Sequence, residues 1–153
     1  MNISVQVIPH LQQRYNTVGD WQVRDGTLYI TVSELRYPNG VPYAKKENGQ
    51  FVLAVHEMIE AFSCLYKGIT EKEVDAFDLD LKKIEEAQEL AIEIGDHPDS
   101  PYKQPHMLAS GVERILCYVF GITWYEYEEL LILLEEHYTQ TKEDEKDAKR
   151  HTG

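Results

Sequence analysis

Apolar and polar residues alternate along the first third of the chain, as they do in strands that bury one face. The alternation is clear in residues 2–9 and returns in segments 17–23 and 27–35. Between the last two segments stand Asp25 and Gly26, a pair that is favoured in two-residue hairpin turns. We therefore expect a small antiparallel sheet of about three strands at the N-terminus.

After residue 50 the pattern changes to the helical period of about 3.6 residues. The most apolar helical segment is 51–67, and a glycine follows it. Thr70 and Glu73 form a capping box, which predicts a second helix that continues to about residue 94. Pro105 suits the first turn of a third helix, and a further capping box at Thr123 begins a fourth.

The fold class that follows is α+β, with the small sheet first and about four packed helices after it. A chain of 153 residues is long enough to bury a core without disulfides. We expect residues 1–136 to form a single domain. Charged side chains dominate residues 137–153, which are expected to be a disordered tail.

The charge of the chain narrows the classes of partner. It has 27 acidic and 15 basic residues, a formal net charge of −12. Nucleic acids and anionic membrane surfaces attract clustered lysine and arginine, so we expect binding to neither. Cys64 and Cys117 lie in apolar helical patterns and are expected to be reduced, and no apolar run is long enough to span a membrane. These features predict a cytoplasmic protein and leave its partner and its oligomeric state open.

A histidine and two glutamates interrupt the most apolar helix. His56 and Glu60 are four residues apart and so lie on one helical face, with Glu57 one position round. The H-E-x-x-H motif of metalloproteases arranges two zinc ligands and a general base in this way, and glutamate is also a zinc ligand. His56 and Glu60 are therefore candidate ligands of a divalent metal, zinc first. Glu57 is the candidate base of a hydrolase that uses a metal-activated water.

A catalytic zinc ion needs a third protein ligand and an open position for water. His106 is the leading candidate, because it begins a helix expected to pack beside 51–67, and Asp78 is the second. The polar loop that follows residue 94 could rim or close the site through Asp96, His97 and Asp99. The residues that share a helical face with His106 would form a second wall, and the polar ones are Ser110 and Glu113.

The order of several motifs resembles a family of small proteins of phages and prophages. The motifs are RYNTVGDW, a strand that ends in ITVSEL, VHEMIEAFSCLYKGITEKEVDAFD, GDHPDSPY and GITWYEYE, within residues 2–128. The resemblance implies that the chain is a phage or prophage protein, but it implies no particular reaction. It also adds Asp75 and Tyr102 to the candidate pocket residues. The chain is also similar to minimal zincins, in which a strand precedes the H-E-x-x helix. Glu60 departs from the zincin pattern, which weighs against proteolysis more than against metal binding.

Plainer interpretations compete with a catalytic metal site. His56 could be a histidine at the edge of the core that bonds a neighbouring carboxylate, with Glu57 and Glu60 paired to Arg114 or a lysine. Glu113 and Arg114 could likewise pair at the surface. The metal could also be purely structural. The main alternative function is a non-enzymatic phage accessory protein that binds a host protein or a small ligand.

Overall fold

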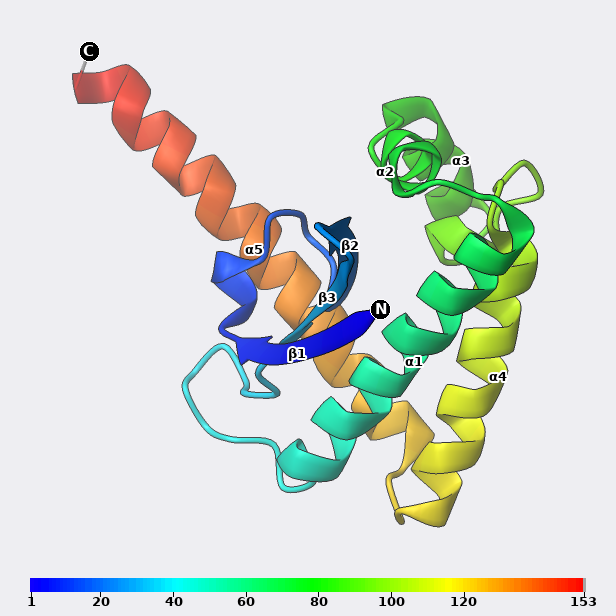
Figure 1. The fold of residues 1–153 in the computed structure, drawn as a ribbon. Coiled ribbons are helices and arrows are strands. Elements are labelled where there is room, and N and C mark those ends of the chain that lie inside the picture. Colours follow the sequence, from blue (N-terminus) through cyan, green and yellow to red (C-terminus); the bar gives the residue numbers. More distant parts are fainter. Residues whose placement is uncertain (153) are drawn as a thin grey trace.

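The structure, a computed structural model, describes residues 1–152 and confirms the α+β class. Three strands come first, and five α-helices follow (Figure 1). The elements in chain order are β1 (Asn2–Ile8), the 3-10 turn η1 (His10–Gln12), β2 (Gly19–Arg24), β3 (Thr27–Ser33), α1 (Lys46–Lys67), α2 (Glu71–Asp78), α3 (Leu81–Glu89), the 3-10 turn η2 (Ile94–Asp96), α4 (Lys103–Val119) and α5 (Trp124–Thr152).

The sheet is mixed rather than antiparallel. β3 is its central strand, antiparallel to β2 and parallel to β1. The expected hairpin is present, and Asp25 and Gly26 both have positive φ in its two-residue turn. The antiparallel arrangement expected for β1 is wrong, because the chain leaves β1 at Pro9, turns through η1 and enters the sheet again at its far edge.

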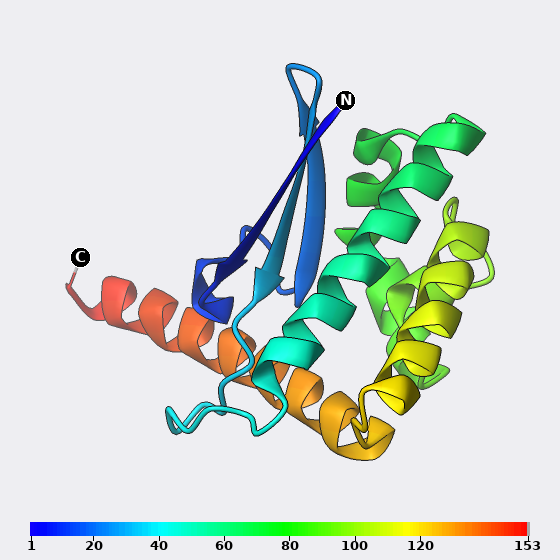
Figure 2. The ribbon, with the colours of Figure 1, turned by 60° about the horizontal axis from the view of Figure 1, so that its bottom comes forward.

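α1 lies between the sheet and α4, so that the sheet, α1 and α4 form successive layers (Figure 2). The face of β3 that carries Leu28 and Ile30 is fully buried, and Val52 and Leu53 of α1 belong to the same core. The opposite side of α1 packs along α4. Polar residues on that side are therefore held between two helices and removed from water.

The helix ends follow the local sequence closely. α1 ends at Gly68, whose φ of 72° is left-handed, and Thr70 and Glu73 form the predicted capping box of α2. The single helix expected from 70 to 94 is instead two. Asp80 divides it, because its side chain accepts hydrogen bonds from the amides of Lys82 and Lys83 and so caps the start of α3.

α5 crosses the end of the helical layers, and its C-terminal half extends away from the body (Figure 1). Its first turns bury Tyr127, Leu130 and Leu134. Where a disordered tail is expected from residue 137, the structure continues α5 as helix to Thr152, and Gly153 lies outside the described residues. None of the described helices combines the length and the apolar character that a membrane crossing needs.

Candidate metal centre

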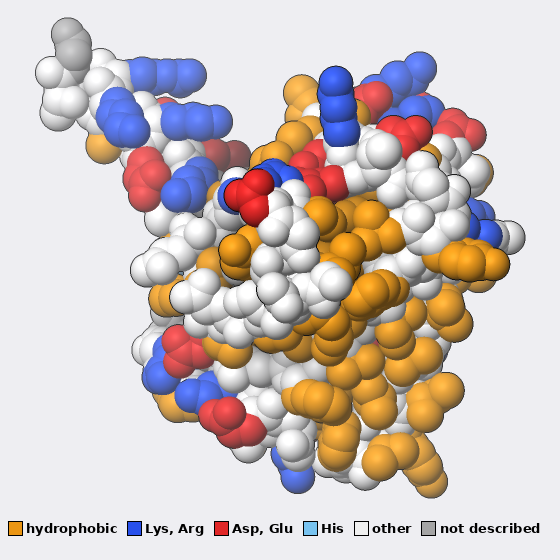
Figure 3. Space-filling view, viewed as in Figure 1, with side chains coloured by type: hydrophobic (Ala, Val, Ile, Leu, Met, Phe, Trp, Pro, Cys, Tyr) orange, Lys and Arg blue, Asp and Glu red, His pale blue; other side chains and the backbone are white. Residues whose placement is uncertain are grey.

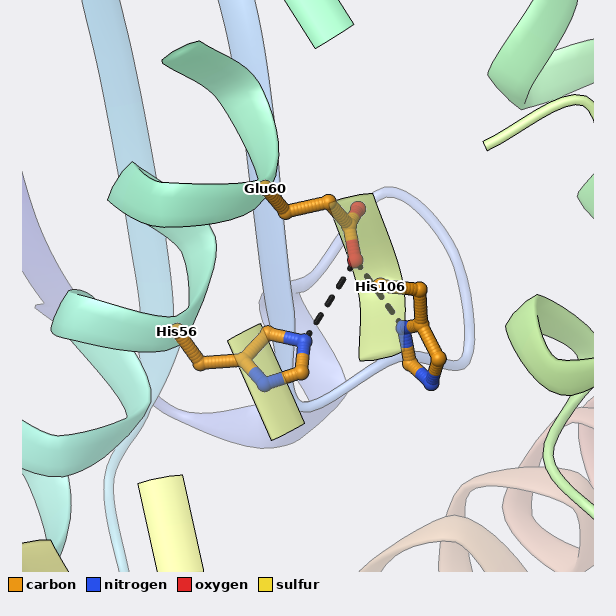
Figure 4. A group of neighbouring side chains, drawn as sticks. All are labelled: His56, Glu60 and His106. Carbon is orange, nitrogen blue, oxygen red and sulfur yellow. Dashed lines mark hydrogen bonds and ion pairs between the residues drawn. The ribbon is translucent and has the colours of Figure 1, made fainter. Parts of the chain in front are cut away.

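Three side chains meet between α1 and α4, at the place where the sequence predicts a metal. His56 and Glu60 project from α1, and His106 projects from the first turn of α4 toward them (Figure 4). Glu60 Oε2 lies 3.4 Å from His56 Nε2 and 3.0 Å from His106 Nδ1. All three side chains are at least nine-tenths buried. Residues that are up to 50 positions apart in the sequence thus offer three donor atoms to one point.

The spacing of these donor atoms fits a small divalent cation. Zinc bonds of ~2.0–2.1 Å in tetrahedral geometry place neighbouring ligand atoms ~3.4 Å apart. The two separations from Glu60 are 3.4 and 3.0 Å, and the three donor atoms lie within 4.8 Å of one another. Two imidazoles and one carboxylate are also a donor set that zinc accepts.

The second nitrogen of each imidazole faces a carboxylate. His56 Nδ1 lies 3.0 Å from Glu113 Oε1, whose other carboxylate oxygen accepts a hydrogen bond of 2.6 Å from the Tyr127 hydroxyl. His106 Nε2 lies 2.8 Å from a carboxylate oxygen of Glu93. Metal-bound histidines characteristically donate their other N–H to such a group, which fixes the tautomer and raises the basicity of the ligand.

The same contacts favour the cationic form of both imidazoles. Burial opposes the charge of His106, but its hydrogen bonds to Glu60 and Glu93 outweigh burial and raise its pKa to about 10. Burial also opposes the charge of His56, and bonds to Glu113 and Glu60 raise its pKa well above the usual value. These bonds in turn overcome burial at Glu60 and lower the pKa of that carboxyl. A bound metal would take the place of two protons.

Glu57, the expected base, points away from this cluster. Its carboxylate lies against Gly19 of β2, so closely that a Cβ on that glycine would overlap it. Burial and the charge of Glu60 raise the pKa of Glu57 well above its usual range. Among residues 1–152, no hydrogen bond to its carboxylate is found. Glu57 is thus a buried, protonatable carboxyl group beside the cluster and on the sheet side of α1.

Asp78 and Tyr102 lie near the cluster but do not join the ligands. The Tyr102 hydroxyl donates a hydrogen bond to Asp78, and the Tyr102 ring meets the His106 ring edge-on with centroids 6.0 Å apart. Burial raises the pKa of Asp78 to about 7, although the bond from Tyr102 opposes this. Asp75 lies elsewhere, in an ion pair with Arg14 at 3.1 Å.

The loop before α4 divides between the cluster and a separate ion-pair group. Asp96 borders the cluster, with Oδ1 3.9 Å from His106 Nε2, and Ser110 Oγ lies 3.5 Å from the same nitrogen. His97 instead bonds Glu86 at 2.8 Å. Asp99 likewise pairs with Lys83, also at 2.8 Å, and so stands outside the cluster. These bonds tie the loop to α3.

Three residues that the sequence does not single out complete the surroundings of the ligands. They are Glu93 and Tyr127, described above, and Trp21, whose indole N–H donates to Glu60 Oε1 at 3.3 Å. Trp21 and Tyr127 reach the site from elements distant in the sequence, and Glu93 reaches it from the segment between α3 and η2. The expected pairing of the glutamates with Arg114 is not found among the described residues, because that guanidinium lies over the Trp124 ring, 4.6 Å from its centroid.

Two open grooves lie on the surface of the described residues. One, of about 490 Å³, lies between α1 and α4 and is lined chiefly by apolar side chains, among them Phe62, Tyr66 and Leu108. Pro105, the neighbour of His106, also lines it. The other, of about 570 Å³, is polar and contains Arg14 and Asp75. The three candidate ligands line neither groove.

In comparisons with known proteins, no family model, curated protein or solved structure matches the chain.

Proposed function

We propose that the protein binds a divalent metal ion, with zinc as the first candidate, through His56, Glu60 and His106. The observation that supports this best is the double arrangement at the histidines. Each ring turns one nitrogen toward Glu60 and the other toward a second carboxylate, Glu113 or Glu93. Both nitrogens of a buried ring need partners, and here the two rings also share one carboxylate oxygen, Glu60 Oε2. Two imidazoles that converge on one point, each with a further carboxylate behind it, are typical of metal ligands.

The buried charges give this proposal an energetic reason. Burying a carboxylate or an imidazolium is costly unless a partner compensates it, and Glu60 shares its Oε2 between two rings. A divalent cation would replace two bound protons with a single centre of the same total charge. It would also join α1 to α4, so we expect binding to stabilise the fold by mass action.

Elemental analysis tests the metal directly. Protein purified without chelator or affinity tag, supplied with zinc and dialysed, is expected to retain one equivalent per chain. His106→Gln preserves size and hydrogen bonding but should bind less than a tenth of that amount. His137→Ala is the matched control, because His137 is exposed on α5. Wild-type protein that retains no stoichiometric metal would overturn the proposal and favour the non-enzymatic alternative.

Hydrolysis is the second candidate function, and the buried carboxyl group of Glu57, next to His56 in the sequence, favours it. A bound zinc ion would act as a Lewis acid and lower the pKa of a coordinated water. The chain supplies a buried carboxyl group one residue from a ligand, and a carboxylate within reach of a metal-bound water is a competent general base. To act so, the Glu57 side chain must turn from Gly19 toward the cluster.

Glu57→Gln separates this candidate from simple metal binding. Zinc-loaded wild-type protein is expected to hydrolyse at least one member of a panel of chromogenic esters, amides and phosphoesters. Glu57→Gln should keep its zinc content and lose at least ~100-fold in rate. Equal rates in the two proteins would show that Glu57 is not the general base. A wild-type protein that binds zinc but hydrolyses nothing in the panel would indicate a metal with a structural role only.

The setting that we propose is that of the phage and prophage proteins that the chain resembles, in the cytoplasm of a host cell. The net charge of −12 disfavours nucleic acid as the partner. A host protein or a small ligand remains the partner class that we propose.

A further inference from the structure

The first strand forms an unprotected edge of the sheet. The strand order places β1 at one side of the sheet, with β3 as its only neighbour among the described strands. All of its residues but the last are exposed. Ile3, Val5 and Val7 are 47%, 46% and 44% exposed, although they share a face with the buried side chains of β3. This face of β1 extends beyond the cover that α1 gives to the rest of the sheet.

Natural edge strands are usually blunted by charged residues, prolines, bulges or short length. β1 has seven residues, pairs continuously with β3 and contains neither charge nor proline. The first charged side chain of the sequence is Arg14, so this edge is neutral in a chain with a net charge of −12. Two copies of β1 could therefore pair without bringing charged side chains of the two strands together.

The backbone of β1 is arranged to accept another strand. The amide of Asn2 donates to Gly26, and the carbonyl of Ile8 accepts from Glu34, so these residues direct their backbone groups toward β3. Backbone direction alternates along a parallel pair. Ile3, Val5 and Val7 therefore direct their N–H and C=O groups outward from the sheet.

We propose that β1 pairs antiparallel with β1 of a second copy of this chain, about a two-fold axis that passes beside Val5. Val5 then faces Val5, and Ile3 faces Val7 of the second copy. These are the residues whose backbone groups are free, so each facing pair can exchange two hydrogen bonds. The two sheets become one continuous sheet in the order β2-β3-β1-β1-β3-β2.

The self-complementary sequence favours a second copy over an unrelated strand. On the face of β1 that carries Ile3, Val5 and Val7 the apolar positions are symmetric about Val5, and on the other face Ser4 pairs with Gln6. At these five positions one strand supplies what its partner requires, and only the end pair, Asn2 with Ile8, is unlike. An unrelated strand would have to reproduce this neutral alternation independently.

The surface beside β1 supplies the rest of the interface. A paired strand of seven residues is only ~23 Å long, which buries far less than the ~800 Å² per partner of a stable interface. Hydrophobic side chains gather next to the sheet edge, over α1 and α4 (Figure 3). Phe51 and Phe62 of α1 are 51% and 44% exposed. The two-fold axis puts both copies of α1 on the same face of the joined sheet, on either side of the β1 pair.

Sedimentation of the full chain at ~1–100 μM tests the proposal, and a dimer is expected. Val5→Lys places two ammonium groups side by side at the axis and should weaken dimerisation at least ~100-fold while the chain remains folded. Val41→Lys is the matched control, because Val41 is a similarly exposed valine, 54%, in the loop before α1. It should remain dimeric. A monomeric wild-type protein, or a Val5→Lys dimer of unchanged affinity, would overturn the proposal.

A second variant keeps the test decisive if Val5→Lys does not fold. Val5→Cys places two thiols opposite each other at the axis. With oxidised glutathione as oxidant they should form one disulfide per dimer, and each disulfide formed yields two reduced glutathiones. The native Cys64 and Cys117 are buried and should not react. Val41→Cys should not crosslink above the background of the native chain. Equal crosslinking of the two variants would exclude the two-fold arrangement.

Discussion

Replacement of Glu113 by glutamine tests whether the carboxylate behind His56 acts on a bound metal. Glu113 is well suited to this test, because its side chain is only 9% exposed and touches no proposed ligand except His56, at 3.0 Å. Glutamine keeps the size, an acceptor for His56 Nδ1–H and a partner for Tyr127, but it removes the charge. The change should therefore reduce the basicity of His56 without opening a cavity.

The expected magnitude follows from the role of such outer carboxylates. Their replacement typically lowers metal affinity by ~10–100-fold, or ~1.4–2.7 kcal/mol. A competition titration with a chromophoric zinc chelator at constant pH measures this difference. Glu93 is 64% exposed, so water screens its bond to His106, and Glu93→Gln should have a smaller effect. Glu89→Gln, an exposed change on α3, should have none.

Zinc affinity in Glu113→Gln within two-fold of the wild type would refute this reasoning. It would mean that the bond from Glu113 only positions the ring. A loss as large as that of His106→Gln would also contradict it, since a supporting carboxylate cannot matter as much as a ligand. Thermal unfolding of the metal-free proteins separates both outcomes from a general loss of stability.

Three further changes probe the supports of the site and of the fold. Gly95→Ala would place a Cβ against the His106 ring and should destabilise the protein by ~1–3 kcal/mol and weaken zinc binding, as chemical denaturation and the chelator titration would show. Thr70→Ala removes a helix cap and should cost ~1 kcal/mol of unfolding free energy with zinc binding unchanged. The pKa of Asp78 is raised to about 7, so between pH 4 and pH 7 the folded state holds a proton that the unfolded chain has released. The free energy of unfolding should therefore fall as pH rises through this range, by at most ~4 kcal/mol in total. Asp78→Asn should flatten that dependence in urea titrations at pH 5 and pH 8, and an unchanged slope would exclude Asp78 as its source.

Local sequence predicted the parts of the fold that short-range chemistry decides. Asp25 and Gly26 fixed the hairpin, and Thr70 fixed the start of α2. The parallel pairing of β1 with β3 could not be predicted in this way, because it depends on the route that the chain takes around the sheet. The break at Asp80 was predictable in principle, since an aspartate immediately before a helical segment is an ordinary N-cap.

The candidate centre likewise contains residues that local sequence predicts and others that only the folded chain brings together. Helical spacing alone predicts that His56 and Glu60 lie side by side on α1. The expected packing of α4 against α1 then predicts that His106 lies close to them. Glu93 and Tyr127 escaped prediction because nothing in their own neighbourhood marks them. They reach the histidines only after the chain has folded back from an adjoining turn and from α5.

The hydrogen bond from Trp21 to Glu60 gives the protein an optical reporter of its own. The emission of an indole responds to charge near its N–H, and this N–H lies 3.3 Å from a carboxylate oxygen of the cluster. The chain has one other tryptophan, Trp124, so Trp124→Phe leaves a single emitter at the centre. Occupation of the site could then be followed in real time by rapid mixing, without dye or label, in the same molecules whose zinc content is measured.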